Sequence, residues 1–319
     1  MVGALATFAR PAAALTIVPP SLEFPADPGQ KITTKVKLFN EESTPIAVFS
    51  STANFTAKDE QGDPDFTFQD TPTDLASWIQ VGAGPFTLAS GDRVEIPVTI
   101  QVPTNAEPGG HYASLFFGTD PSLKPENGGQ VSIRSLIGTL VILRVSGQVT
   151  EQASLKTFAV NGKTTTFSHG PVNFDVRVQN SGNVHVRPSG SLLIKNMWGR
   201  TVATVPLNST EGAVLPNSIR KFSVTWGEAA ASKGFFGQVA AEWHHFNLGM
   251  YSAELDGAYG STKKSLSGSV TFLMFPWHLL LIEAIVVLIL LFVLIFGIKR
   301  YNSMIIHRAQ GSQFPKARP

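Results

Sequence analysis

A run of twenty residues, Leu279 to Ile298 (LLLIEAIVVLILLFVLIFGI), constrains the fold more than any other feature of this sequence. At about 1.5 Å of rise per residue, a helix over this run is roughly 30 Å long, the thickness of the hydrocarbon core of a bilayer. A buried core helix is the alternative, but the basic residues that follow the run favour a membrane. We therefore predict a juxtamembrane segment and one transmembrane helix within residues 271–298.

Aromatic and basic residues flank this run, as they do at the two interfaces of membrane-spanning helices. The predicted interface anchors are Phe272, Phe275, Trp277, Lys299, Arg300 and Tyr301. Beyond Ile298 the sequence holds five basic residues and no Asp or Glu, so the positive-inside rule places residues 299–319 in the cytoplasm as a basic tail. The expected location is the plasma membrane, crossed once, with the N-terminal part outside (type I topology).

Glu283 is the one acidic residue inside the predicted span. An ionisable residue in a membrane indicates function by default, because a charge is unfavourable there. Glu283 lies only about a turn from the outer end of the run, which leaves two explanations. Its carboxylate reaches water at the interface, or it makes a helix–helix contact with a basic residue of another membrane subunit.

The chain before Thr271 is slightly acidic, since it holds 20 of the 25 basic residues and 22 of the 23 acidic ones. Nucleic-acid binding needs a concentrated basic face, so this class of partner is excluded. The sequence has no cysteine, so its domains must be stabilised by packing without disulfides. Absence of cysteine from an exported chain is typical of bacterial or archaeal surface proteins.

Residues 1–14 are apolar and end in an A-x-A pattern that suits signal-peptidase cleavage before Leu15. The stretch lacks a basic n-region, and Arg10 interrupts its short apolar part. We predict the remnant of a signal peptide here, and a disordered N-terminal segment is the alternative.

Residues 15–147 alternate between short strand patterns and turn residues, without a helical period. The clearest strand is Lys31 to Asn40, in which Ile32 and every second residue as far as Leu38 face one side, with lysine and threonine on the other. Short strands of this kind, separated by Pro, Gly and Asp, are typical of an antiparallel β-sandwich.

Residues 148–270 repeat this pattern, beginning with an alternating strand at Pro171 to Gln179. We also predict a strand over Gly234 to His245, preceded by one helical turn at Glu228 to Ser232. The sequence thus predicts a second sandwich of similar size. The linker between the two, residues 146–150, is short enough to limit their relative movement.

Candidate catalytic groups are few. Without cysteine there is no thiol nucleophile, and the histidines fall in no H-E-x-x-H or nucleophile-elbow context. Glu242, His244 and His245 form the best cluster, but neighbouring residues of a strand point to opposite faces, which leaves too few ligands for a metal. His185, between two valines, suits packing or a local hydrogen bond. We predict no enzyme and assign no catalytic, cofactor or metal residue.

Two further features have a structural and a functional interpretation. The acidic stretch from Lys58 to Asp74 lacks the D-x-D-x-D-G order of a calcium loop, so a solvated loop is expected. Large aromatic residues either fill the cores or form an exposed face for sugars or peptides. The residues concerned are Trp78, Tyr112, Phe116, Phe117, Trp198, Trp226 and Trp243.

Two segments resemble a known family. Trp78 to Phe117 (WIQVGAGPFTLASGDRVEIPVTIQVPTNAEPGGHYASLFF), with its P-x-x-x-A-x-G turn and G-x-x-Y-A strand, resembles the first ectodomain of the WxL-interacting surface proteins of Gram-positive bacteria. Asn180 to Val202 (NSGNVHVRPSGSLLIKNMWGRTV) resembles their second domain, which leads into one transmembrane helix and a short basic tail. The resemblance implies immunoglobulin-like domains, a cell-surface location, and binding of peptidoglycan or of a partner surface protein.

The first domain also resembles the N-terminal domain of periplasmic pilus chaperones, which implies a partner that donates a β-strand. The predicted fold class is therefore an all-β ectodomain of two tandem immunoglobulin-like antiparallel β-sandwiches, followed by a single transmembrane α-helix. The predicted function is a membrane-anchored, non-enzymatic surface protein that binds cell-wall polymer or a partner surface protein through loops and strand edges. The alternative is an accessory subunit of a membrane complex, assembled through the helix and Glu283.

Overall fold

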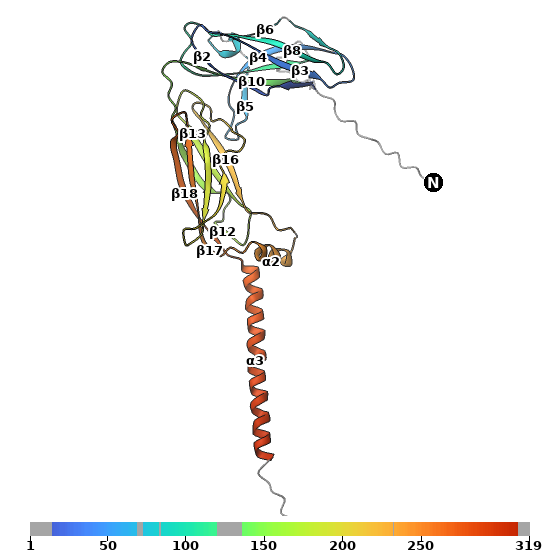
Figure 1. The fold of residues 1–319 in the computed structure, drawn as a ribbon, viewed down its shortest axis with the longest axis vertical. Coiled ribbons are helices and arrows are strands. Elements are labelled where there is room, and N and C mark those ends of the chain that lie inside the picture. Colours follow the sequence, from blue (N-terminus) through green and yellow to red (C-terminus); the bar gives the residue numbers. More distant parts are fainter. Residues whose placement is uncertain (1–14, 69–72, 83, 120–135, 232, 312–319) are drawn as a thin grey trace, which may run out of the picture.

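The computed structural model describes residues 15–68, 73–82, 84–119, 136–231 and 233–311. They form two β-sandwiches, two short helices and one long helix (Figure 1). The first sandwich lies across one end of the second, and the long helix α3 (Trp277–Gly311) extends from the other end. The expectations for residues 1–14 and for the tail beyond residue 311 lie outside the described residues.

Two sheets build the first sandwich. One has the strand order β1 (Leu15–Val18), β3 (Lys31–Asn40), β8 (Arg93–Gln101) and β6 (Ile79–Val81). The other has the order β2 (Ser21–Ala26), β10 (Leu136–Val145), β9 (Gly109–Gly118), β4 (Ile46–Ala57) and β5 (Pro64–Thr67), with β7 (Phe86–Leu88) also on β4. The short helix α1 (Leu75–Trp78) precedes β6. Leu38, Leu115 and Phe117 belong to the single core between the sheets.

The second sandwich combines a three-stranded sheet with a five-stranded one. The first has the order β11 (Ala153–Val160), β13 (Val172–Asn180) and β16 (Ser218–Trp226). The second has the order β12 (Thr166–Phe167), β18 (Lys264–Met274), β17 (Gly249–Tyr259), β14 (Ser189–Lys195) and β15 (Thr201–Pro206). Aromatic rings fill much of its core: the Phe272 centroid lies 5.5 Å from that of Phe174 and 5.8 Å from those of Trp226 and Tyr251.

Both domains are immunoglobulin-like β-sandwiches, as predicted, because each packs two mostly antiparallel sheets face to face around one core. The alternation predicted for β3 is confirmed, since Val36 and Leu38 are fully buried and the alternating Lys35 and Lys37 are exposed. Each domain also contains one parallel pair, β2 with β10 and β12 with β18. The sheets are therefore mixed, because alternation within a strand does not define the direction of its partner.

Residues 235–244 form helix α2 (Phe235–His244), so the strand predicted here is wrong. The segment FFGQVAAEWH contains Gln238, Ala240, Ala241 and Glu242, which are good helix formers. Its apolar residues also recur at the spacing i, i+3, i+4 and i+7 of a helix, and the predicted strand overlooked this period.

Strand β18 continues to Met274, past the boundary expected at residue 270. Phe272 is therefore a core residue of the second sandwich, with only 1% of its surface exposed. Its prediction as a membrane-interface anchor is wrong, because a side chain enclosed by Phe174, Trp226 and Tyr251 is unavailable to lipid.

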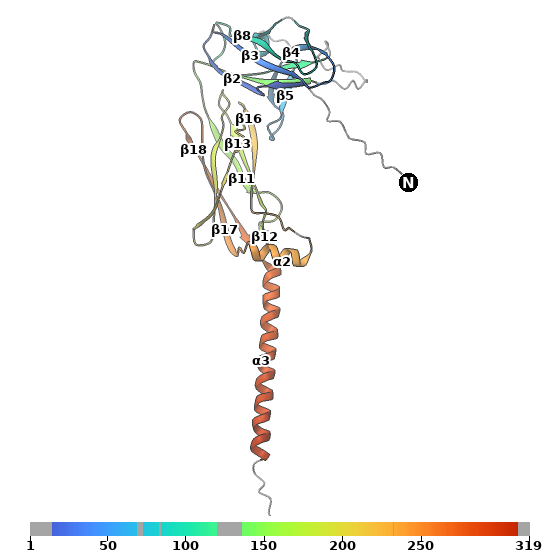
Figure 2. The ribbon, with the colours of Figure 1, turned by 45° about the vertical axis from the view of Figure 1, so that its right-hand side comes forward.

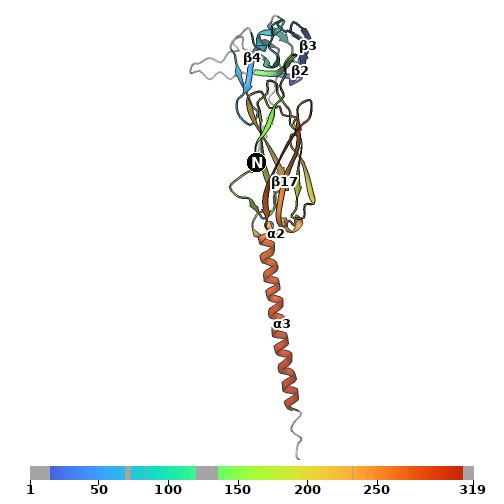
Figure 3. The same cartoon turned by 90° about the vertical axis from the view of Figure 1, so that its left-hand side faces the viewer.

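Among the described residues, α3 is the one helix long and apolar enough to cross a membrane, over Trp277–Ile306. None of its apolar window is buried within the molecule. Figures 2 and 3 show α3 as an isolated rod, with α2 as the only described element beside its first turns. Beyond the first turns, which α2 flanks, the apolar sides of α3 thus have no cover within the described part of the chain.

Candidate functional site

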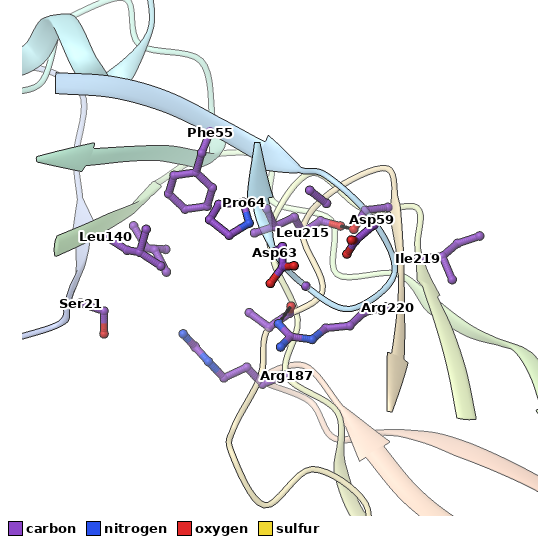
Figure 4. Close-up of a pocket in the computed structure, with 15 residues that line it drawn as sticks. Ser21, Phe55, Asp59, Asp63, Pro64, Leu140, Arg187, Leu215, Ile219 and Arg220 are labelled. Atoms are coloured by element: carbon purple, nitrogen blue, oxygen red, sulfur yellow. Dashed lines mark hydrogen bonds between the residues drawn. The ribbon is translucent and has the colours of Figure 1, made fainter. Parts of the chain in front are cut away.

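A cleft of about 190 Å³ lies between the two sandwiches (Figure 4). Phe55 and Leu140 enter it from the first domain, and Arg187 and Arg220 enter it from the second. Ligand sites occur preferentially at domain interfaces, in concave regions that combine apolar walls with a few polar groups. This cleft has that composition and is the candidate binding site.

A polar cluster that joins the domains borders the cleft. The Glu23 carboxylate of β2 accepts two hydrogen bonds from Arg187, 2.7 Å from Nη2 and 3.1 Å from Nη1. The same carboxylate lies 2.9 Å from Nε2 of His185. The backbone N–H of His185 in turn donates to the Tyr112 hydroxyl at 2.7 Å, and that hydroxyl lies 3.3 Å from Nδ1 of the same ring. His185 therefore bonds across the domain boundary as well as packing.

The environment of this cluster shifts its pKa values. Burial, reinforced by the nearby charge of Arg187, lowers the pKa of His185 despite the opposing effect of Glu23, so the ring is neutral near pH 7. Burial alone raises the pKa of Glu23, but the hydrogen bond and charge of Arg187 outweigh it, and the net pKa lies below its ordinary value. Burial raises the pKa of Tyr112, which keeps its hydroxyl protonated. The site thus pairs one carboxylate with one guanidinium beside a neutral imidazole.

The short linker is bonded to both domains. Asn183 accepts a hydrogen bond from Thr150 N–H at 2.7 Å and donates to the carbonyl oxygens of Gln148 at 3.0 Å and Pro108 at 3.2 Å. Its own carbonyl accepts from Gly110 N–H at 2.8 Å. These contacts support the prediction that movement between the domains is limited.

The turn between β4 and β5 reaches from the first domain onto the edge strand β16 of the second. The carbonyl oxygen of Glu60 accepts a hydrogen bond from Lys221 N–H at 2.6 Å. The Glu60 carboxylate lies 2.7 Å from Arg177 Nε as an ion pair. This part of the acidic stretch, predicted to be a solvated loop, is therefore an interdomain contact.

Arg220 forms the floor of the cleft between two glycines. A Cβ added at Gly62 would lie 2.3 Å from the Arg220 guanidinium carbon, and one added at Gly212 would lie 2.7 Å from it. Nη1 donates to the carbonyl of Ala213 at 2.8 Å. Burial lowers the pKa of Arg220 against the opposing effect of Asp63. An anionic group that enters the cleft would find the remaining guanidinium donors without a partner among the described residues.

The cluster considered for a metal, Glu242, His244 and His245, does not form one site. Glu242 is fully buried and accepts from His278 Nδ1 at 2.6 Å and from Leu279 N–H at 2.7 Å, whereas His244 and His245 are exposed. No group of three or more His, Asp or Glu side chains suited to a metal exists within the described ranges.

The other predicted site residues lie on α3 or at its start. Phe275 and Trp277 are exposed where β18 leads into α3, and Tyr301 is exposed near the far end with Lys299 and Arg300. Glu283 lines a groove of about 740 Å³ together with residues of α3 and the α2 region. It has no ion pair or hydrogen bond with another described residue.

The aromatic residues divide between cores and surface. Trp78, Phe116 and Phe117 are buried in the first domain, and Trp226 packs against the core of the second. By contrast, Trp198 is 80% exposed and Trp243 is 71% exposed. Neither exposed tryptophan lines the interdomain cleft.

The sequence does not predict the cleft residues, because residues that meet there are far apart in the chain. Glu23 and Arg187 are separated by 164 positions, and no local pattern links them. The only available signal was His185 flanked by valines, since a polar residue at a predicted buried position needs a partner.

No protein-family model matches the sequence, and no curated protein matches it. Three solved chaperone structures are similar to this chain. The class 5 fimbriae chaperone CfaA is 12% identical with a TM-score of 0.38, over 82% of this chain and 99% of its own. The CsuC–CsuE chaperone–tip adhesion subunit complex of Acinetobacter baumannii is 14% identical with a TM-score of 0.36, over 81% of this chain and 98% of the matched chain. The Pseudomonas aeruginosa CupB2 chaperone is 12% identical with a TM-score of 0.36, over 81% of this chain and 100% of its own. At these values the likeness carries no argument on function.

Proposed function

We propose that this chain is a membrane-anchored, non-enzymatic surface protein that binds a partner surface protein in its interdomain cleft. The observation that carries the proposal is the cleft itself, in which the half-buried guanidinium of Arg220 faces apolar side chains at a fixed domain junction. Arginine in such a setting suits a carboxylate, because its planar donors match two oxygens at once.

The anchor in this proposal is α3. Its sides are exposed and apolar over Trp277–Ile306, and Lys299 and Arg300 follow the apolar run predicted from the sequence. We take the positive-inside rule to set the orientation, with the sandwiches outside the plasma membrane. The resemblance to WxL-interacting surface proteins supports the same arrangement.

The proposed ligand is an extended segment with an acidic group. Phe55, Leu140 and Leu215 offer apolar contacts, and Ser21 begins β2, an edge strand of its sheet. An extended segment beside an edge strand can add main-chain hydrogen bonds while its side chains fill adjoining pockets. Peptidoglycan, whose stem peptides also carry carboxylates, is the second ligand to test.

The test uses the full-length chain in lipid nanodiscs, with purified surface proteins and purified cell walls offered separately. We expect saturable binding of a surface protein that is lost in Arg220→Gln and retained in Lys156→Gln, which removes an exposed positive charge from β11. Thermal unfolding of both variants checks that they are folded. Binding to walls alone would replace the partner with cell-wall polymer, and binding that Arg220→Gln leaves unchanged would exclude the cleft.

A further inference from the structure

Helix α2 exposes an apolar side and turns polar groups inward, the reverse of a helix on a water-soluble domain. Phe236, Val239, Ala240 and Trp243 share one side of the helix at i, i+3, i+4 and i+7. Phe236 is 78% exposed, and Trp243, two turns further along the same side, is 71% exposed. Glu242 projects to the opposite side and is fully buried.

The orientation of α2 is fixed by that inward polar side. Glu242 bonds to the ring of His278 and to the backbone N–H of Leu279, which is one of the unpaired donors of the first turn of α3. Gln238 bonds to His169 in the loop between β12 and β13. The exposed apolar side therefore has a defined direction relative to α3 and to the second sandwich.

Other exposed aromatic residues gather at the same end of the molecule. The turn after β14 carries Trp198, and the methyl group of the preceding Met197 lies against Gly249, the first residue of β17. Gly249 pairs with Met274, at the end of β18 from which α3 continues. We call the exposed set the aromatic collar: Trp198, Phe236, Trp243, Phe246, Phe275 and Trp277.

The collar is continuous with the apolar surface of α3. Trp243 and Phe246 line one groove together with Leu279, Ile282 and Val286, which lie on the first three turns of α3. In Figures 1 and 2, α2 lies crosswise beside the start of α3. The apolar side of α2 therefore faces the same surroundings as the upper part of α3.

We infer that α2 and the aromatic collar lie in the headgroup region of the bilayer, with α2 parallel to the membrane plane. The inference rests on the proposed function only in that α3 crosses a membrane. Lipid is the occupant we assign, because the exposed surface continues without interruption onto a helix whose surroundings would be lipid. Tryptophan and phenylalanine are also the residues that accumulate at this depth.

This placement accounts for Glu283. It lies six residues after Trp277, about 9 Å along the helix axis at 1.5 Å per residue. With the collar at headgroup level, its carboxylate is near the boundary between headgroups and acyl chains and not at the centre of the bilayer. Glu283 then reaches water or ammonium headgroups through the groove beside Trp243.

The inference also assigns a role to α2. A single helix tethers a domain but leaves it free to tilt, whereas a second contact on the membrane surface removes that freedom. With α2 bonded to both α3 and the second sandwich, the ectodomain is held at one orientation above the bilayer.

Site-directed spin labelling tests the inference directly, since the native sequence has no cysteine that would also react. Single variants Phe236→Cys, Leu290→Cys and Thr262→Cys of the full chain are labelled and reconstituted in vesicles of phosphatidylethanolamine and phosphatidylglycerol. Collision rates with oxygen and with a nickel chelate then separate lipid, water and protein surroundings. Leu290 reports on the middle of α3, and the exposed Thr262 reports on the distant turn between β17 and β18.

We expect the label at 290 to collide often with oxygen and rarely with nickel, and the label at 262 to do the reverse. The label at 236 should give an oxygen-to-nickel ratio between these two. A label at 236 that behaves like 262 would overturn the inference, and one shielded from both reagents would mean that protein covers α2. In either case a lipid signal at 290 would leave the membrane anchor intact. A water signal at both 236 and 290 would contradict the anchor as well.

Discussion

The two ends of the second sandwich differ in how polar and apolar side chains are arranged. At the end that meets the first domain, charged and polar groups such as Glu23, Arg187 and His185 are drawn into a junction where they bond to one another. At the end that meets α3, aromatic side chains such as Phe236 and Trp243 are left exposed. The first end bonds polar groups to one another across the domain boundary, and the second leaves apolar groups exposed.

The two ends differ in what their side chains contact. At the junction the buried ring of His185 is tolerated because it bonds to Glu23 and to the Tyr112 hydroxyl, which makes the contact specific to one arrangement of the domains. A large exposed apolar patch is tolerated only where another apolar phase or a partner covers it. The junction therefore sets the arrangement of the two sandwiches, and in our proposal the collar sets their orientation on the membrane.

The largest expected effect separates the core of the second sandwich from the collar. Phe272→Ala should lower the free energy of unfolding by about 3–5 kcal/mol, because it opens a cavity among four aromatic neighbours. Phe275→Ala, only three residues on but exposed, should change it by less than about 0.5 kcal/mol. Denaturant unfolding of the full chain in detergent measures both. An effect of Phe272→Ala as small as that of Phe275→Ala would contradict the placement of Phe272 in the core.

Glu242→Ala should have the second-largest effect, at the contact between α2 and the start of α3. The change leaves the His278 ring N–H and the Leu279 N–H without an acceptor, at about 1–3 kcal/mol for each buried donor. We expect hydrogen exchange of the α2 amides to accelerate while that of β13 stays slow. Glu242→Gln, which keeps one acceptor oxygen, serves as the matched variant with a smaller effect. Unchanged exchange in α2 would show that Glu242 does not fix the helix.

At the junction, Gly62→Ala should disturb the contact between the domains. The new Cβ would collide with the Arg220 guanidinium, and the positive φ of 92° adds strain of about 1 kcal/mol or more. Gly91→Ala is the control, because Gly91 has a φ of 77° but open space around it. We expect both variants to lose stability and only Gly62→Ala to expose Arg220 to chemical modification. Protection of Arg220 in both would mean that the turn after β4 does not close the cleft.

The smallest effect is a dependence on pH. Because the pKa of His185 in the folded chain lies below the ordinary 6.5, the unfolded chain takes up a proton first as the pH falls. Stability contributed by the neutral ring is thus present above pH 6.5 and is lost progressively below it. Glu23, whose pKa is also lowered, adds a loss of the same sign below pH 4.5. In thermal melts, His185→Gln should remove the loss of stability below pH 6.5 and leave the loss below pH 4.5. A wild-type melting temperature that stays constant from pH 7 to 5 would contradict the role given to His185.

The sequence predicts the parts of this molecule that depend on local periodicity. The alternation of β3 and the apolar run of α3 both repeat along the chain, so each is visible without its neighbours. The number of domains follows from length and turn spacing. These features needed no knowledge of which strand lies beside which.

The candidate site and the collar depend on partners that the local pattern does not contain. Glu23 meets Arg187 only because β2 lies at a sheet edge next to the second domain. The strand predicted at α2 is wrong because it overlooks the helical period of the apolar residues, which here face outward and not toward a core. The prediction for Phe272 is wrong because an aromatic residue near an apolar helix suits either a membrane interface or the last strand of a sandwich core.

The cleft can bind a partner as proposed only if the two sandwiches form one rigid unit, with the cleft at their junction. The most direct test is the distance between spin labels at Lys31→Cys in β3 and Lys156→Cys in β11, measured by double electron–electron resonance on the full chain in nanodiscs at pH 7.5. Our account predicts a single narrow distance distribution, because the junction fixes both domains. A broad or bimodal distribution would contradict it, since the cleft would then have no constant shape for a partner to bind.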